Sequence, residues 1–221
     1  MLISFCLQLV PGSFAIFYHY ALGKTGMKKA DDRALSFILG VEIFITIVWL
    51  IIYFLTLTIF YNFPEIKSIV LFILSGIFFA EAIAALFFYY RKGRSTALFI
   101  PRKIARGITM KIEKAKNRSD CILLGAIIGL FELVFTLPLY FASASVIINF
   151  DAMPRVFAIA FYVLFSVLPL FITRYVFKMG GNLADIERFR VKIKRLIKIV
   201  LFFSFILIGL ATIYLGVINN G

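Results

Sequence analysis

The sequence predicts an all-α integral membrane protein with six transmembrane helices and both termini outside. Three observations lead to this prediction: the apolar composition, the number of long apolar runs, and the placement of the basic residues. The chain of 221 residues is 62% hydrophobic, with a mean hydropathy of +1.01, whereas soluble domains are closer to half apolar. Since only an apolar solvent tolerates so much apolar side chain at the surface, we expect a lipid bilayer around the protein.

Six apolar segments are long enough to cross the hydrocarbon core, which takes about 20 helical residues. They span residues 1–22, 34–61, 69–90, 121–148, 156–177 and 196–218. The runs are continuous and not alternating, which favours helices over strands. The second and fourth runs are long enough to tilt or to extend beyond the bilayer. The first run lacks a basic leader and a small-residue cleavage site, so we expect a retained helix and not a signal peptide.

The basic residues orient these helices. Of the 24 Lys and Arg residues, 21 lie in three stretches, at residues 23–33, 91–120 and 178–198, while the alternate loops hold only Lys67 and Arg155. Membrane proteins concentrate Lys and Arg in their cytoplasmic loops. The net charge of +13 is therefore explained by the orientation of the protein in the membrane, and no nucleic-acid partner is expected. We expect one membrane domain over residues 1–221, in a prokaryotic cytoplasmic (inner) membrane.

The longest basic loop, residues 91–120, has a helical pattern. Within "LFIPRKIARGITMKIEKAK" an isoleucine recurs at every fourth position, at Ile100, Ile104, Ile108 and Ile112. Basic residues fall mostly between them, as in a helix that lies on a membrane surface. Anionic lipids of the inner leaflet are then the expected partners of this loop. A flexible charged linker is the alternative, which Gly107 favours.

Five ionisable side chains interrupt the predicted helices: His19, Glu42, Glu81, Glu132 and Arg174. A charge in hydrocarbon is costly, so each is a candidate functional residue. Arg174 lies near a helix end, where its long side chain can extend to the lipid headgroups. Glu132 lies near the middle of its helix and is the strongest candidate for binding a proton, a cation or a polar solute. A protonated carboxyl group that hydrogen-bonds a neighbouring helix is the alternative.

Prolines interrupt three of the helices, at Pro11, Pro138 and Pro169. A proline inside a helix frees a backbone carbonyl and kinks the helix. The halves 1–90 and 121–218 each hold three predicted helices, so they have opposite topology. Inverted repeats with broken helices are a recurrent plan of transporters, with the binding site at the midplane. The predicted solute or ion pathway comprises Gln8, Pro11, Gly12, Ser13, Glu42, Glu81, Glu132, Thr136 and Pro138.

Three segments resemble known membrane proteins. "LQLVPGSFAIFYHYALGKTGMKKA" is similar to the opening of lysine-exporter superfamily proteins, with a Pro-Gly pair before a short basic loop. "LLGAIIGLFELVFTLPLY" resembles the fourth helix of the cytochrome c biogenesis and thiol-disulfide transmembrane family, which belongs to that superfamily. The final "LFSVLPLFITRYVF" and "RFRVKIKRLIKIVLFFSFILIGLATIYLG" look like the last two helices of the same family.

This resemblance implies the family's six-helix fold, but this chain lacks the cysteine pair on which the family's thiol-transfer reaction depends. Its thiol-transfer members carry one cysteine directly after the proline of helix one and a second in helix four. Here Gly12 and Phe135 stand at those places. In this chain Cys6 lies toward the outer end of the first predicted helix, and Cys121 begins the fourth predicted helix at the inner face. About the thickness of the membrane separates these levels, whereas a disulfide requires Cα atoms within about 7 Å.

We expect a transporter that moves a small solute or ion through a midplane site between broken helices one and four. One alternative is a thiol-disulfide relay through Cys6 and Cys121, and another is a membrane scaffold that transports nothing. No sequence motif of a soluble enzyme is present, so no catalytic residue and no cofactor is expected. A single histidine excludes a histidine-rich metal site.

Overall fold

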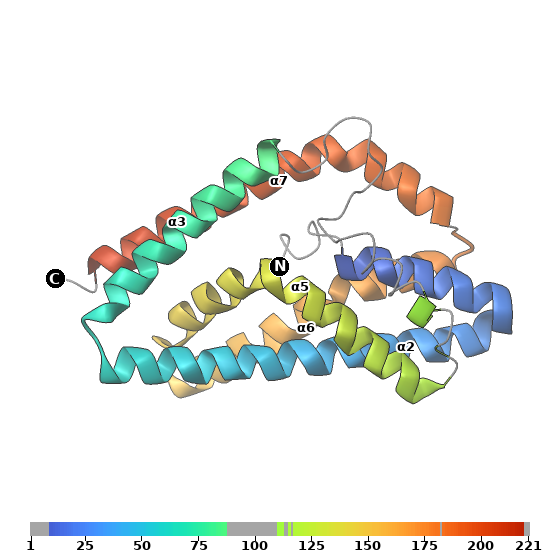
Figure 1. The fold of residues 1–221 in the computed structure, drawn as a ribbon, viewed down its shortest axis with the longest axis horizontal. Coiled ribbons are helices and arrows are strands. Elements are labelled where there is room, and N and C mark those ends of the chain that lie inside the picture. The colour runs from blue at the N-terminus through green and yellow to red at the C-terminus, as the bar shows by residue number, and fades with distance from the viewer. Residues whose placement is uncertain (1–8, 88–109, 113–114, 116, 182, 219–221) are drawn as a thin grey trace.

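The computed structural model of the chain describes all residues except 1–8, 88–109, 113–114, 116, 182 and 219–221 (Figure 1). Side chains of residues 9–12, 132, 134–135 and of most residues between 183 and 197 also lie outside the description. The elements in chain order are α2 (Leu9–Asn62), α3 (Ile66–Phe87), α5 (Arg118–Ile147), α6 (Ala152–Lys178) and α7 (Leu183–Ile218). The described part of the chain is therefore helical, as the sequence predicts.

Helix α2 is a hairpin of two helical parts that meet at Gly26. A straight helix of its 54 residues would measure about 80 Å, far more than the hydrocarbon thickness of about 30 Å. Gly26 has φ 73° and ψ 167°, a conformation that is essentially restricted to glycine. The two parts lie side by side (Figure 1), and the rings of Phe17 and Phe37 are 5.1 Å apart. These parts correspond to the predicted helices 1–22 and 34–61.

Helix α5 bends sharply at the point where Pro138 removes a backbone hydrogen bond. Its parts Arg118–Phe131 and Thr136–Ile147 make an angle of 85°. A proline leaves the carbonyl four residues earlier without its helical donor, and here that carbonyl belongs to Val134, within the bend. By contrast, α6 continues through Pro169 as one helix. Pro11 stands at the edge of the described residues, so the break predicted there stays a prediction.

The other helix boundaries differ from the sequence prediction in one important place. Helices α3, α5 and α6 begin and end within a few residues of the predicted 69–90, 121–148 and 156–177. The apolar part of α7, Lys198–Val217, agrees with the predicted membrane segment 196–218, but the helix itself begins earlier, at Leu183. The search for apolar runs missed this first part, whose charged residues alternate with apolar ones. Such a pattern forms a helix but would not lie in hydrocarbon.

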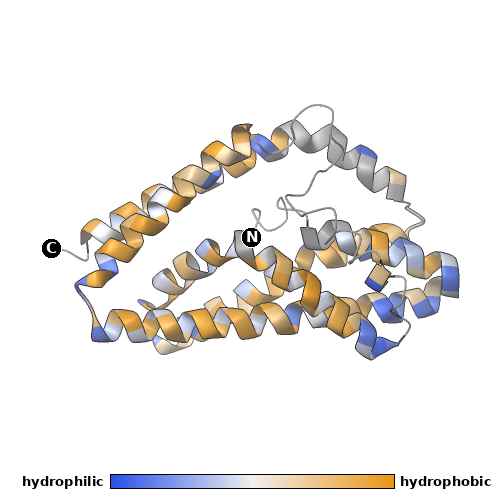
Figure 2. Cartoon of the chain, viewed as in Figure 1, coloured by the Kyte–Doolittle hydropathy of each residue, from blue (hydrophilic) through white to orange (hydrophobic). Residues whose placement is uncertain are grey.

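Among the described residues, four helices are long and apolar enough to cross a membrane, or five if the two parts of α5 form one span. Large apolar side chains are exposed along them, including Ile51, Phe54 and Leu207, and hydrophilic residues gather near helix ends and turns (Figure 2). A soluble protein rarely exposes so large an apolar surface. The chain is therefore a helical integral membrane protein, whereas six spans, inverted repeats and outside termini stay predictions.

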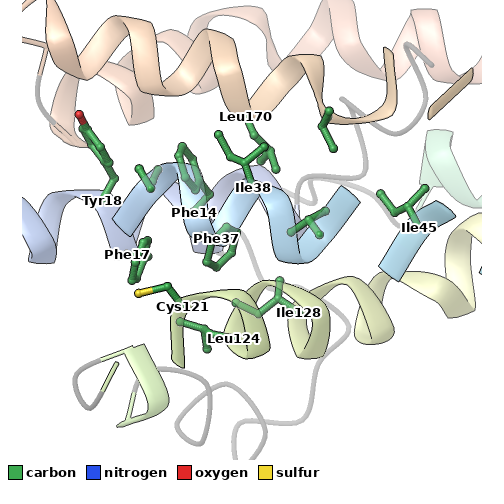
Figure 3. Close-up of a cluster of buried hydrophobic side chains, with 14 of the residues drawn as sticks. Phe14, Phe17, Tyr18, Phe37, Ile38, Ile45, Cys121, Leu124, Ile128 and Leu170 are labelled. Atoms are coloured by element: carbon green, nitrogen blue, oxygen red, sulfur yellow. The ribbon is translucent and has the colours of Figure 1, made fainter. Parts of the chain in front are cut away.

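The helices pack in two groups that combine both predicted halves of the chain. Helices α2, α5 and α6 share a core that includes Phe14, Phe37, Ile38, Ile128 and Leu170 (Figure 3). Helices α3 and α7 form a second core and lie side by side (Figure 1). The main contacts between different helices therefore join residues of 1–90 to residues of 121–218.

Glycines allow the first part of α5 to lie directly on α2. A Cβ atom on Gly40 would overlap the backbone of Ile122, and a Cβ atom on Gly125 would overlap the backbone of Phe37. Small residues at such crossings allow close backbone contact between membrane helices. This packing fixes the first part of α5 on α2. The part beyond the bend contacts both helix groups, since Tyr140 and Ala144 belong to the core of α2, α5 and α6 and Ala142 belongs to the core of α3 and α7.

Most of the predicted surface helix in loop 91–120 lies outside the described residues. At its end, residues 110–112 are helical, and Ile112 and Ala115 are buried in the core of α2, α5 and α6. The end of this loop therefore packs on the protein. Binding of the loop to anionic lipids stays a prediction.

Candidate solute cavity

A cavity of about 440 Å³ lies between the second part of α5, α6 and α7. Its volume falls in the range of about 300–1,000 Å³ that is common for small-molecule sites. Most of its wall is apolar, and its polar lining residues are Thr136, Tyr140, Ser143, Tyr162, Ser166 and Thr212. None of the described residues that line it carries a charge.

The bend in α5 places the hydroxyl groups of that helix at the cavity. Thr136 is the first residue of the second part, and it is buried and lines the cavity. Tyr140 and Ser143 follow one and two turns later and line it as well. Backbone groups that a break frees within a membrane must face protein or a cavity. A bend beside a cavity satisfies this requirement.

A hydrogen-bonded aromatic cluster forms the wall of the cavity toward α2. The indole Nε1 of Trp49 donates to Oγ of Ser143 at 3.0 Å, and Ser143 in turn donates to the backbone oxygen of Tyr140 at 2.9 Å. Ser143 also shares a hydrogen bond with Tyr162, whose ring lies 5.7 Å from that of Trp49. Buried polar networks that are satisfied in this way rigidify their surroundings.

The sequence gives only a weak signal of this cluster. Trp49 is the only tryptophan of the chain, and a lone tryptophan in the middle of an apolar run is a weak signal. Its indole N–H requires a partner when it is buried. A search for a serine or threonine on another predicted helix could have suggested one, but could not have chosen Ser143.

Two further hydroxyl groups face the cavity from α6 and α7. Ser166 donates its hydrogen to the backbone oxygen of Val163 at 2.6 Å. Thr212 donates to the backbone oxygen of Gly209 at 2.8 Å. Because a hydroxyl group has one hydrogen but two lone pairs, each oxygen can still accept a hydrogen bond.

The structure brings only some of the predicted pathway residues to this cavity. Thr136 lines it, and Pro138 is half-buried on the same part of α5. Ser13 is buried in the first part of α2, beside the helical backbone of Pro11 and Gly12. Gln8 lies outside the described residues, as does the side chain of Glu132, whose backbone is at the bend of α5.

The other two predicted glutamates lie at separate places. Glu42 lines a hollow of about 490 Å³ between α2 and α6, together with Thr46 of the next helical turn. Glu81 is on α3, and its Oε2 atom is buried without a hydrogen-bond partner among the described residues. Neither side chain lines the cavity at the bend of α5.

Of the two cysteines in the alternative thiol-disulfide relay, the structure describes only Cys121. Cys121 is fully buried with a free thiol, and it lies among Phe17, Phe37 and Leu124 (Figure 3). Cys6 is outside the described residues. Thiol exchange requires an accessible thiolate, which this apolar position does not favour. Among the described residues no group of three or more His, Cys, Asp or Glu could hold a metal ion.

Arg174, near the end of α6, pairs with an aspartate of α2. Its Nε and a terminal nitrogen donate to the two carboxylate oxygens of Asp31 at 2.6 and 2.7 Å. Lys178 lies 2.9 Å from the same carboxylate, and the hydroxyl group of Tyr18 donates to it at 3.5 Å. The sequence did not predict this pairing, which forms because α2 presents Asp31 to the end of α6.

Comparison of the chain with protein-family models, with curated proteins and with solved structures finds no match. The class of protein is defined by its own fold and site: a helical integral membrane protein with a cavity beside a bent helix, whose described lining residues carry no charge. The resemblance to the lysine-exporter superfamily stays a proposal.

Proposed function

We propose that the protein moves a small solute across the membrane through the cavity between α5, α6 and α7. The observation that supports this function best is the cavity itself, because it joins apolar walls to several hydroxyl groups among membrane helices. A scaffold needs no such space. The proposed site includes the predicted broken helix four, but its other walls are α6 and α7 in place of helix one.

The bend in α5 supplies a place where the protein can change shape. The first part of α5 packs on α2 through Gly125. The second part contacts both helix groups, with Tyr140 in the core of α2, α5 and α6 and Ala142 in the core of α3 and α7. Rotation about a bend changes the relative position of the elements packed on its two sides. Motion between the two helix groups would then open and close the cavity.

The sequence resemblance to the lysine-exporter superfamily leads to the same proposal. It implies a transporter of six spans, arranged as inverted repeats with outside termini, in a prokaryotic inner membrane. Glu132, at the bend, would carry a coupling proton. In that case Glu132→Gln should abolish the pH dependence of transport. An unchanged pH dependence would show that Glu132 does not carry the coupling proton.

Solute flux into reconstituted vesicles tests the proposed function. Purified protein is placed in liposomes, and uptake of labelled amino acids, neutral alcohols and amphiphilic amines is compared with uptake by protein-free vesicles. Ala158 lines the cavity, so Ala158→Phe should block it. Ala160 lies on the same helix but lines the hollow with Glu42, so Ala160→Phe is the matched control.

The expected result is uptake of at least one solute class that Ala158→Phe removes and Ala160→Phe preserves. The proposal fails if no class enters faster than in protein-free vesicles. It also fails if Ala158→Phe transports like the unmodified protein.

A further inference from the structure

We infer that the cavity binds a neutral amphiphile whose polar end is a hydrogen-bond donor, such as a long-chain alcohol, and that this ligand comes from the bilayer. The inference rests on the proposed function, since it names the ligand class of the same cavity. It follows from three properties of the lining: the position of its opening, the hydrogen-bonding state of two of its hydroxyl groups, and the lack of charge among its described residues.

The rim of the cavity is apolar and lies at the surface of the membrane helices. Phe161 is 57% exposed, Val146 is 39% exposed and Phe165 is 37% exposed, and all three line the cavity. Deeper lining residues are closed off, with Thr136 at 4% and Thr212 at 3% exposure. A ligand that enters past this rim comes from hydrocarbon and places its apolar body between aromatic rings.

Two hydroxyl groups of the cavity lining, those of Ser166 and Thr212, offer hydrogen-bond acceptors. Ser166 and Thr212 use their hydroxyl hydrogens within their own helices, on Val163 and Gly209. Since these oxygens have no hydrogen left to give, a bound polar group satisfies them by donating. An ether or ester, which only accepts, would gain no hydrogen bond from them.

The lining favours a neutral donor over an ammonium group. Burial of a charge away from water is costly unless an opposite charge pairs with it, and no described lining residue carries one. Aromatic faces can attract a cation, and Tyr140, Phe161 and Tyr162 line the cavity. A quaternary amine is therefore the competing ligand that the experiment must include.

Trp49 provides a built-in probe of cavity occupancy. It is the only tryptophan of the chain, it is fully buried, and it donates to Ser143 of the cavity wall. Bromine quenches indole fluorescence at short range. A brominated ligand in the cavity should therefore quench Trp49, whereas brominated molecules in the surrounding lipid should quench it weakly.

The experiment titrates the purified protein, in lipid nanodiscs, with dibromo-octadecanol, its methyl ether, the matching carboxylate and the matching trimethylammonium compound. We expect saturable quenching by the alcohol, with an affinity about fivefold above that of the ether, the factor that corresponds to one neutral hydrogen bond. Ala158→Phe should abolish the saturable component and Ala160→Phe should keep it. The double variant Ser166→Ala and Thr212→Val should reduce the affinity for the alcohol to the affinity for the ether.

Several results would overturn the inference: equal quenching by alcohol and ether, stronger quenching by the carboxylate or the ammonium compound, or no effect of Ala158→Phe. Failure of the proposed function would look different, with saturable quenching by the alcohol but no solute flux in vesicles. Conversely, flux of a water-soluble solute that Ala158→Phe blocks, without any quenching, would reject the ligand class and retain the function.

Discussion

Arg174 and Asp31, 143 residues apart in the chain, form a two-bond salt bridge in which Nε and a terminal nitrogen of the guanidinium group contact both carboxylate oxygens. Their side chains are only 19% and 16% exposed. The pair joins the turn region of α2 to the end of α6. Parallel hydrogen bonds of this kind are stronger than bonds between neutral groups and fix the geometry of both partners.

Asp31→Asn should destabilise the protein, because it leaves the Arg174 guanidinium group half-buried without its counter-charge. We expect a loss of about 1–3 kcal/mol, as for hydrogen bonds to charged groups. Asp32→Asn is the control, since its pair with Arg118 at 3.4 Å is mostly exposed and should contribute less than about 1 kcal/mol. Unfolding by SDS in mixed micelles measures both, and equal losses would contradict the assigned role of Asp31.

Gly40→Ala should force α2 and α5 apart. Its new methyl group would overlap the backbone of Ile122, and overpacking of this kind typically costs about 1–3 kcal/mol. Gly76→Ala on α3 is the matched control, because nothing lies within 4 Å of a Cβ atom there. The transition midpoint of thermal unfolding in detergent should fall for the first variant only. A midpoint for Gly40→Ala equal to that of Gly76→Ala would disprove the close contact.

Gly26→Ala should destabilise the hairpin of α2. Its backbone conformation, φ 73° and ψ 167°, is poorly accessible to alanine and costs of order 1–3 kcal/mol. Gly23→Ala, three residues earlier in open space, should have no such effect, because alanine favours a helix there. Proteolysis in detergent followed over time is the measurement. Equal protection of both variants would show that the turn does not require Gly26.

Ser143→Ala should change the environment of Trp49 and weaken the cavity wall. The indole N–H then loses its acceptor at 3.0 Å, which costs about 1–3 kcal/mol for a buried donor. The emission maximum of the single tryptophan should shift. Ser145→Ala is the control, since Ser145 donates only to Phe141 of its own helix, and it should leave the emission unchanged. An emission spectrum of Ser143→Ala identical to that of the unmodified protein would show that Trp49 does not donate to Ser143.

Cys121 should react with a thiol reagent only after unfolding, because its side chain is fully buried. The experiment uses Cys6→Ser, in which Cys121 is the only cysteine, and a membrane-permeant maleimide. We expect slow labelling in detergent that becomes fast in SDS. Cys121→Ser, with Cys6 as the only cysteine, shows whether the reagent is active. Fast labelling of folded Cys121 would return the thiol relay to consideration.

The sequence predicts a large part of this fold and a smaller part of the candidate site. The apolar runs predict α3 and α6 within a few residues, and Pro138 predicts the bend in α5, because these properties depend on local composition and backbone chemistry. The polar start of α7 is missed, since a helix outside hydrocarbon need not be apolar. Thr136 is predicted as a site residue and lines the cavity, while Ser143 and Thr212 resemble any other hydroxyl group of a membrane helix.

By itself, the sequence determined that this protein is helical, that a membrane surrounds it and where its chain must turn, because hydrocarbon requires apolar length and backbone hydrogen bonds within each segment. Only the tertiary structure decided which helices meet. Contacts such as Asp31 with Arg174 and Trp49 with Ser143 join residues 143 and 94 positions apart. Most spans are similarly apolar, so their composition does not select neighbours, and the partners follow from shape at Gly40 and Gly125 and from a few polar groups.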